Sequence, residues 1–219
     1  MNVSLVSYTK SEVEGINNLQ ELVAYCARVS NPDNQLNNQT SEKLITYLIK
    51  NQHWSPLEMV NVCLEITTTR DIARQILRHR SFSFQEFSQR YADPTQELDF
   101  VNRESRLQDK TNRQNSIEID DSSLLINFHM NQKKLVSKAI NYYRDAISKG
   151  IAKEQARVFL PEGLTVSKLY MNGNMRSWLH YIQLRSSNGT QKEHMEIALE
   201  CSKVISKVFP LIEKFTKNK

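Results

Sequence analysis

The densest group of residues that could do chemistry lies between residues 78 and 91. This stretch holds three arginines, a histidine, a glutamate and three serines, interleaved with aromatic side chains. Guanidinium groups pair with phosphates and stack on planar rings, so the mixture indicates a site for a planar, phosphorylated ligand. Single-stranded nucleic acid is a second candidate for the same mixture. A helix that merely ends on basic residues explains Arg78 and Arg80 equally well from charge alone, although a solvated turn has little need of four aromatic side chains.

A second group of cations lies on the helix that the spacing predicts over residues 174–185. At 100° per residue, Arg176 and His180 share one polar face, whereas Arg185 falls on the opposite side, beside the apolar stripe that carries Trp178. An arginine at the edge of an apolar face needs an anionic or acceptor partner. An ion pair with a buried carboxylate would satisfy that need as well as a ligand would.

Composition excludes several other kinds of site. The chain has 219 residues and only five glycines, none spaced for a glycine-rich phosphate-binding loop, so a bound nucleotide must be held by side chains. The five histidines lack metal-ligand spacing, and no metal site is expected. Cys26, Cys63 and Cys201 form neither a disulfide framework nor a nucleophile-like context, which fits a reducing cytoplasm. A net charge of +5 and a mean hydropathy of −0.54, with no long apolar run or signal peptide, favour a cytoplasmic protein without membrane contact.

The elements that must position these groups are mostly helices. Alternating apolar residues predict strands over 3–8 and 60–67, and residues 166–171 could form another. Thr68, with Asp71 three residues later, resembles a capping box that starts a helix running to about Arg80. Since the strands are not in βαβ order, we expect an α+β fold of one domain, with a small, mostly antiparallel sheet packed with long helices, unlike a Rossmann fold. The polar residues 101–123 are expected to be a mobile excursion. Helices are predicted over 12–29, 41–51, 124–149, 153–160, 174–185 and 191–208.

Several of these residues also resemble the motifs of one known family. Arg78-His79-Arg80, then seven residues and Ser88, resembles the R-H-R-x7-S signature of the flavin-dependent thymidylate synthases, the ThyX family. The resemblance covers nearly the whole chain outside residues 101–123, and departs from the family pattern at Leu57, Met59, Gln85 and Gly189. Other blocks similar to family motifs, in the family's order, are 27–30, 53–58, 156–161, 174–185 and the pair Gln191 and Glu193.

The resemblance implies an enzyme, a methyltransferase that makes dTMP from dUMP. The carbon would come from methylenetetrahydrofolate, and FAD reduced by NADPH would carry the hydride. The family is a homotetramer whose active sites are shared between subunits, with no nucleic-acid partner. The classical thymidylate synthase uses a cysteine nucleophile instead, and this sequence offers no evident one.

The resemblance also implies roles for individual residues. Arg185 is the expected catalytic residue, because a permanently charged guanidinium can hold negative charge that develops on the uracil. Ser88 is expected to bind substrate rather than to act as a nucleophile. The residues expected to contact FAD are Ser55, Arg78, His79, Arg80, Glu86, Asn174, Arg176 and His180. Those expected to bind dUMP are Gln75, Arg78, Glu86, Phe87, Ser88, Gln89, Arg90, Arg157 and Arg185.

Two other functions stay open at this point. The chain could be a binding module that grips single-stranded nucleic acid, with an affinity that falls steeply with salt. The wide spacing of Arg157, Arg176 and Arg185 along the chain favours convergence on one pocket instead. The other alternative, left open by Gln85 and Gly189, is a relative that acts on a modified pyrimidine nucleotide, or a copy with weak activity.

Overall fold

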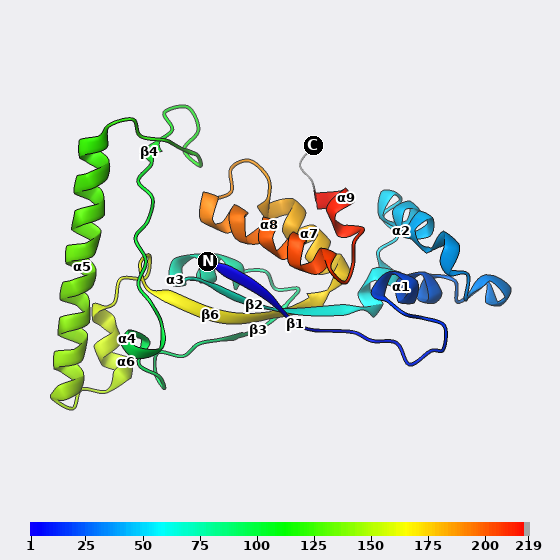
Figure 1. The fold of residues 1–219 in the computed structure, drawn as a ribbon, viewed down its shortest axis with the longest axis horizontal. Coiled ribbons are helices and arrows are strands. Elements are labelled where there is room, and N and C mark those ends of the chain that lie inside the picture. The colour runs from blue at the N-terminus through cyan, green and yellow to red at the C-terminus, as the bar shows by residue number, and fades with distance from the viewer. Residues whose placement is uncertain (217–219) are drawn as a thin grey trace.

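An antiparallel sheet of four strands forms the middle of the computed structural model, which describes residues 1–216 (Figure 1). The strand order is β1-β2-β6-β3, and the two central strands pair from Asn61 opposite Asn174 to Thr69 opposite Val166. The strands are β1 (Asn2–Tyr8), β2 (Asn61–Thr69), β3 (Ser83–Glu86) and β6 (Val166–Asn174), and a separate hairpin pairs β4 (Leu107–Gln108) with β5 (Ser116–Ile117).

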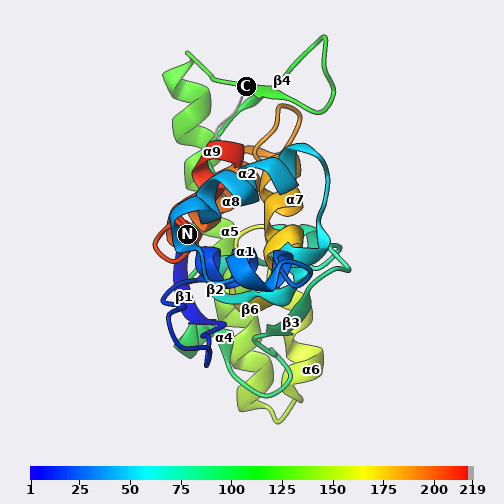
Figure 2. The ribbon, with the colours of Figure 1, turned by 90° about the vertical axis from the view of Figure 1, so that its right-hand side faces the viewer.

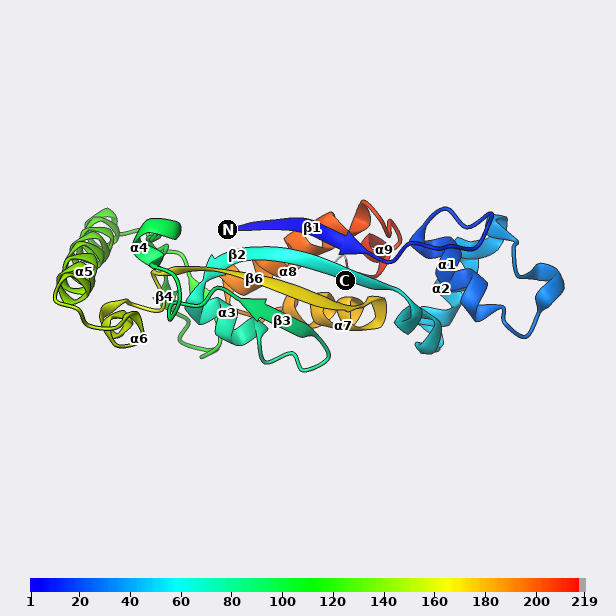
Figure 3. The same cartoon turned by 90° about the horizontal axis from the view of Figure 1, so that it is seen from below.

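Helices cover one face of this sheet and stand at both of its ends. Three of them, α7, α8 and α9, lie over one face, while α1 and α2 lie beyond one end and α5 and α6 beyond the other (Figures 1 and 3). This arrangement confirms the expected α+β fold with a small antiparallel sheet. The helices are α1 (Leu19–Ala27), α2 (Ser41–Lys50), α3 (Arg70–Ile76), α4 (Pro94–Glu97), α5 (Ser122–Ser148), α6 (Lys153–Ala156), α7 (Met175–Arg185), α8 (Lys192–Ser206) and α9 (Ile212–Thr216).

The core lies between the sheet and the helices α7 and α8, which lie above the sheet in the view from the α1 and α2 end (Figure 2). Along β2, Val62, Leu64 and Ile66 are fully buried, which is the alternation that the sequence predicts for a half-buried strand. From the helix side, Trp178 of α7 and Ile205 of α8 pack into the same cluster. Burial of this continuous apolar surface fixes α7 on the sheet.

Three helices are shorter than the sequence predicts, and the one expected over 153–160 is α-helical only over Lys153–Ala156, followed by a 3-10 turn over Arg157–Phe159. The helix expected over 12–29 begins only at Leu19, because Asn18 caps it by accepting a hydrogen bond from the Glu21 amide. The helix expected to start at Thr68 instead follows Thr69, and it ends at Ile76 rather than near residue 80. The predicted capping box is therefore wrong. The Thr69 hydroxyl donates to the Asp71 carboxylate, so Asp71 has a partner other than a free amide of the helix.

Strand β3 is a second difference, since residues 78–91 read as a polar loop. Ser83 pairs with Asn172 and Glu86 with Leu169, which places the motif-bearing segment on the edge of the sheet. The pairing is non-local and the strand has four residues. A segment this short has too few residues to show a period of its own.

Residues 101–118 cross from β3 and α4 toward α8 on a path that two hydrogen bonds fix at its start. The Val101 amide donates to the Leu164 carbonyl over 2.9 Å, and the Arg103 guanidinium donates to the Gly163 carbonyl over 2.9 Å. The mobility of residues 101–123 stays a prediction. The hydrogen bonds of Val101 and Arg103 attach the start of this segment to residues 163 and 164.

We expect replacement of Gly173 with alanine to destabilise the sheet by about 1–3 kcal/mol, as overpacking does elsewhere. A Cβ at residue 173 would lie 2.4 Å from Cδ1 of Phe82, a ring that packs against Trp178. Gly163→Ala is the matched control, since its Cβ would meet only an Asp71 oxygen at 3.9 Å. Urea unfolding measures both variants, and equal stability of Gly173→Ala and Gly163→Ala would contradict the packing argument.

Candidate functional site

Arg185, the expected catalytic residue, lies half-buried at the end of α7. Asn174 caps this helix by accepting from the Ser177 amide over 2.9 Å, and the Trp178 indole donates to the Val62 carbonyl over 3.0 Å. These contacts fix where the helix ends. There the Arg185 guanidinium donates from Nε to Nε2 of His79 over 2.9 Å. The partner that the sequence required is therefore a histidine acceptor and not a buried carboxylate.

The environment of His79 keeps its imidazole neutral. Its pKa is lowered to about 4, first by burial and then by the charges of Arg185 and Arg78. A neutral imidazole whose Nε2 accepts from Arg185 carries its hydrogen on Nδ1. The His79 ring also packs edge-on against buried Tyr181, with 4.9 Å between ring centroids, and burial raises the pKa of that phenol well above its ordinary value. His79 thus orients the guanidinium without cancelling its charge.

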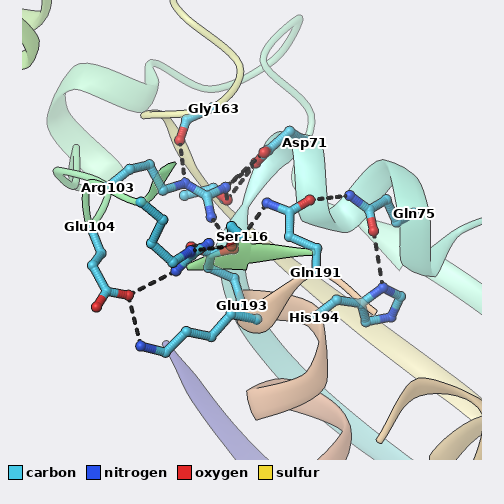
Figure 4. Close-up of polar contacts among 12 residues, drawn as sticks. Asp71, Gln75, Arg103, Glu104, Ser116, Gly163, Gln191, Glu193 and His194 are labelled. Carbon is cyan, nitrogen blue, oxygen red and sulfur yellow. Dashed lines mark hydrogen bonds and ion pairs between the residues drawn. The ribbon is translucent and has the colours of Figure 1, made fainter. Parts of the chain in front are cut away.

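A line of polar side chains continues from Tyr181 toward Gln75, one of the residues expected to bind dUMP. The buried imidazole of His194 lies 3.2 Å from the Tyr181 hydroxyl on one side and 3.2 Å from Oε1 of Gln75 on the other. Gln75 in turn donates from Nε2 to Oε1 of Gln191 over 2.8 Å. Figure 4 shows Gln75 held between Gln191 and His194. We call Gln75, His79, Tyr181, Arg185 and His194 the Arg185 cluster.

A second cluster lies at the other end of α7. The Arg176 guanidinium pairs with the Glu58 carboxylate, and the His180 ring packs edge-on against Trp54 at 4.5 Å. Burial, and then the charge of Arg176, lowers the pKa of His180. Ser55, which begins the turn that carries Glu58, is exposed. The expected FAD residues Ser55, Asn174, Arg176 and His180 are thereby brought to one end of the helix.

Glu86 centres a third cluster, where the expected dUMP residues of β3 meet α3. Its carboxylate lies 3.6 Å from the buried Arg70 guanidinium and 3.3 Å from that of Arg74, and it accepts from the Ser167 hydroxyl over 2.8 Å. Burial lowers the pKa of Arg70, and the Glu86 charge opposes that effect. Because this chain's own cations occupy the carboxylate, Glu86 is a positioning group for Arg70 and Arg74 in this subunit.

An open hollow of about 450 Å³ adjoins this third cluster. Gln89 lines it and is buried, yet its Nε2 has no hydrogen-bond partner. Arg157 lines it too, and among residues 1–216 no carboxylate lies within 4.0 Å of the Arg157 guanidinium. The Arg157 Nε donates to the Glu154 backbone carbonyl over 3.2 Å, which leaves the charge of its guanidinium, with the Gln89 amide, for an anionic ligand to satisfy. Arg90, nearby, is paired with Glu154 at 3.1 Å.

The other expected site residues stand outside these three clusters. Arg78 and Arg80 are exposed and follow α3 directly. Phe87 and Ser88 form the turn after β3, where the Phe87 amide donates to the Lys168 carbonyl and the Ser88 hydroxyl accepts from the Arg90 amide. One chain therefore gathers the expected residues at three places, joined by α3 and α7, rather than in a single pocket.

Sequence reasoning missed the residues that support the Arg185 cluster. Tyr181 and His194 carry no motif, and the available signal was a histidine on the buried side of the helix over 191–208. Arg103 was also missed, since it lies in a polar stretch without periodicity. Its guanidinium contacts Asp71 at 2.5 Å and Glu193 at 3.3 Å, which ties the 101–118 segment to α3 and α8.

Two kinds of feature are absent from residues 1–216. No group of three or more histidine, cysteine, aspartate or glutamate side chains in residues 1–216 has the arrangement of a metal site. No helix of the same residues combines the length and the apolar character that crossing a membrane requires.

Half-buried His79 and fully buried His194 predict a loss of stability in mild acid. Each has an ordinary pKa of 6.5, and burial first of all lowers that of His79 to about 4 and that of His194 to about 3. At a pH between the lowered pKa of each histidine and its ordinary pKa of 6.5, the unfolded chain binds more protons than the folded one. The free energy of unfolding therefore falls as the pH falls through this range. His194→Asn should flatten that slope by up to about 1.4 kcal/mol per pH unit. Urea unfolding between about pH 7 and pH 4 measures the slopes, and identical slopes would contradict the prediction.

Comparison with known proteins finds relatives over nearly the full length of the chain. The model of the family described as thymidylate synthase complementing protein (Thy1) matches residues 4–211. The probable flavin-dependent thymidylate synthase of Paramecium bursaria Chlorella virus 1 is 47% identical over 214 residues, which are 98% of each chain. The flavin-dependent thymidylate synthase of Synechocystis sp. is 49% identical over 215 residues, 97% of each chain.

The fold is also shared with a solved structure. The UMP/dUMP methylase PolB from Streptomyces cacaoi, bound with 5-Br dUMP, superposes with a TM-score of 0.79 at 24% identity, covering 99% of this chain and 94% of that one. The family resemblance drawn from Arg78-His79-Arg80 and Ser88 is thus confirmed over nearly the full length. By its sequence and by the extent of these matches, the chain belongs to the family of the flavin-dependent thymidylate synthases.

Proposed function

We propose that this protein is a flavin-dependent thymidylate synthase, which methylates dUMP reductively to dTMP with methylenetetrahydrofolate as carbon donor and NADPH as reductant. The observation that carries the proposal is the pairing of Arg185 with a neutral histidine. Among residues 1–216 no carboxylate lies within ion-pair distance of Arg185, so the full charge of its guanidinium is available to a substrate. A preorganised cation in a partly buried site stabilises negative charge far better than it would in water.

The chemistry of the second cluster fits a flavin dinucleotide. Arg176 lies in the first turn of α7, an eleven-residue helix, where a cation and the positive end of the helix dipole together favour phosphate oxygens. His180 and Asn174 add neutral polar groups, and exposed Arg78 and Arg80, which lie outside this cluster after α3, are the further cations assigned to FAD. When bound, FAD supplies the reducing equivalents that turn the transferred carbon into a methyl group. Ser55, His79 and Glu86 complete the set of residues assigned to FAD.

The third cluster and the Arg185 cluster fit opposite ends of dUMP. Arg157 and the unpartnered amide of Gln89 suit its phosphate, together with Arg78, Arg90, Phe87 and Ser88. Gln75 and Arg185 suit the uracil, because an amide and a guanidinium both donate to carbonyl oxygens. In the reaction Arg185 holds the negative charge that builds up on the pyrimidine ring, and His79 keeps the guanidinium aimed by accepting from its Nε.

The state of the three thiols supports the flavin route over covalent catalysis by cysteine. Burial raises the pKa of Cys26, of Cys63 and most strongly of Cys201. A thiol with a raised pKa carries little thiolate and is a poor nucleophile. All three cysteines are free, which is also in keeping with the reducing conditions of the cytoplasm, where we place the protein.

We further propose that the chain acts as one domain within a homotetramer that shares its active sites. Helix α5 exposes a run of large apolar side chains on a helix that stands away from the sheet (Figure 1). An exposed apolar surface of this kind marks an interface. Light scattering during gel filtration should give four times the 25.5 kDa of one chain, and a monomeric mass would contradict shared sites. The exposed apolar residues of α5 that would form this interface are Leu124, Ile126, Phe128, Met130, Leu135 and Tyr142.

Flavin uptake tests the proposed function. The purified protein, supplied with FAD and then desalted, should keep the yellow absorption of the cofactor. Arg176→Ala should retain less flavin than the wild type, because it loses a cation at the start of α7. A wild-type protein that stays colourless after incubation with FAD would overturn the assignment. Binding to single-stranded DNA of any sequence, with an affinity that falls as salt is added, would favour a nucleic-acid-binding module instead.

A further inference from the structure

One continuous series of hydrogen bonds connects the Arg185 cluster with the 101–118 segment (Figure 4). It begins at Glu193, whose Oε1 accepts from the Arg106 guanidinium over 2.7 Å and whose Oε2 lies 3.3 Å from that of Arg103. Burial raises the pKa of Glu193, but its hydrogen bonds, including that from Arg106, outweigh this effect and hold the pKa below its ordinary value. Glu193 is therefore a carboxylate, and a carboxylate only accepts hydrogen bonds.

Because Glu193 only accepts hydrogen bonds, it fixes the direction of each hydrogen bond from Gln191 through Gln75 to His194. Gln191 faces Oε2 of Glu193 at 2.9 Å and must present its amide NH2 there, so its oxygen faces Gln75. Gln75 must then present its own NH2 to Gln191, so the Gln75 oxygen faces His194. Nδ1 of His194 lies 3.2 Å from that oxygen and must carry the hydrogen.

The contact of His194 with Tyr181, on the other side of the imidazole ring, is consistent with this direction. With the hydrogen on Nδ1, Nε2 of a neutral ring is a bare acceptor, and it lies 3.2 Å from the hydroxyl of Tyr181, which is buried and protonated. The ionisable groups that face His194 are Arg185 and, ring to ring, the neutral His79. Burial first, and then the charge of Arg185, disfavours a second proton on the imidazole. The fully buried ring has no room for water to replace either partner.

We propose that His194 is a positioning residue for substrate: with its hydrogen on Nδ1, it donates to Oε1 of Gln75 and so fixes which way the Gln75 amide faces. The Gln75 NH2 then keeps one N–H for Gln191 and offers the other to a carbonyl oxygen of the pyrimidine. The inference rests on the proposed role of Gln75 in binding dUMP. An amide held at both ends binds without losing rotational freedom, which an unheld glutamine would lose on each binding event.

Two substitutions at residue 194 separate positioning from packing. The asparagine side chain in His194→Asn places an amide N–H where Nδ1 lies, whereas leucine in His194→Leu fills the space without a donor. His194→Leu should weaken dUMP binding about tenfold, the upper value for one net hydrogen bond, with flavin content unchanged. His194→Asn should stay much closer to wild type. The measurements are the dissociation constant for dUMP by calorimetry and the KM for dUMP beside kcat.

The same variants give the outcomes that would overturn the proposal. Equal dUMP affinity in wild type and His194→Leu would overturn it, and so would an equal loss in His194→Leu and His194→Asn, since a purely structural role predicts no rescue by a donor. If His194→Leu does not fold, Gln191→Leu replaces it, because residue 191 is exposed and its loss frees the Gln75 amide. Unchanged dUMP affinity in Gln191→Leu would then count against the proposal.

A second readout does not depend on catalysis. Nitrogen NMR of protein labelled at histidine distinguishes the two neutral tautomers, and the spectrum of His194→Asn identifies the His194 signals. We expect the hydrogen of His194 on Nδ1 in the wild type and a shift toward the other tautomer in Gln191→Leu. The hydrogen on Nε2 in the wild type would refute the direction derived from Glu193. A wild type that neither binds dUMP nor forms dTMP would refute the proposed function and leave this tautomer result readable.

Discussion

Replacing Arg185 with alanine should lower kcat for dTMP formation by about 100- to 1,000-fold, the usual cost of removing one charge-stabilising donor. The guanidinium donates to a neutral partner, the Nε2 of His79 at 2.9 Å, and the other members of the Arg185 cluster carry no positive charge that could replace it. The variant should fold and keep flavin, because Arg185 ends α7 and the helix is fixed to the sheet by Trp178. Steady-state kinetics with dUMP measures the loss.

Arg185→Lys is the matched control for charge. Lysine keeps the positive charge but lacks the planar fork through which Nε reaches His79, so we expect activity between that of alanine and that of the wild type. Circular dichroism and flavin content establish that both variants are folded. Full turnover by Arg185→Ala would remove Arg185 from the catalytic role.

Replacing Trp178 with alanine should lower the free energy of unfolding by about 3–5 kcal/mol, a large share of the 5–15 kcal/mol typical of a native protein. Its side chain is fully buried, packs edge-on against Phe82 at 4.8 Å, and donates to the Val62 carbonyl. The cavity would lie beneath the helix that carries both Arg176 and Arg185. Urea unfolding measures the loss of stability, and flavin retention should fall with it.

Trp178→Phe separates the two contributions of the indole. The ring is largely retained, while the hydrogen bond to the Val62 carbonyl is lost, so we expect a smaller loss than for alanine. A destabilisation of Trp178→Ala below about 1 kcal/mol would contradict the assignment of Trp178 as the anchor of α7.

The elements that the sequence predicts correctly are those with a period of their own. Strand β2 shows the alternation of Val62, Leu64 and Ile66, and α7 shows the helical stripe that carries Trp178. Because a helical stripe also fixes the angle of every other residue on the helix, the position of Arg185 beside the apolar face followed from the sequence. The family resemblance rests on a different kind of signal, namely residue identity at fixed spacing.

The features that escaped prediction depend on contacts between distant segments. Nothing near Arg185 in the sequence names His79 as its acceptor, since the two are 106 residues apart. The same holds for β3, which forms only by pairing with β6, and for the hydrogen bonds of His194 with Gln75. Arg103 illustrates the limit most clearly, because a polar stretch without periodicity carries no sign that one of its side chains bridges Asp71 and Glu193.

The candidate site residues form three separate clusters in one chain, and the proposed tetramer would explain how they act together. The residues proposed for phosphate, near Arg157, and those proposed for uracil, near Arg185, form separate groups, and those proposed for flavin lie near the start of α7. Subunits that share their sites would bring the clusters of different chains together. The exposed apolar side of α5 supplies a surface on which such an assembly can form.

The most direct test of the central claim is the conversion of dUMP by the purified protein in the presence and absence of FAD. Reactions contain methylenetetrahydrofolate and NADPH, and the nucleotide products are separated by chromatography. We expect dTMP to form when FAD is present, and removal of FAD to abolish its formation. Production of dTMP without FAD, or no dTMP from a flavin-loaded, folded protein, would contradict it.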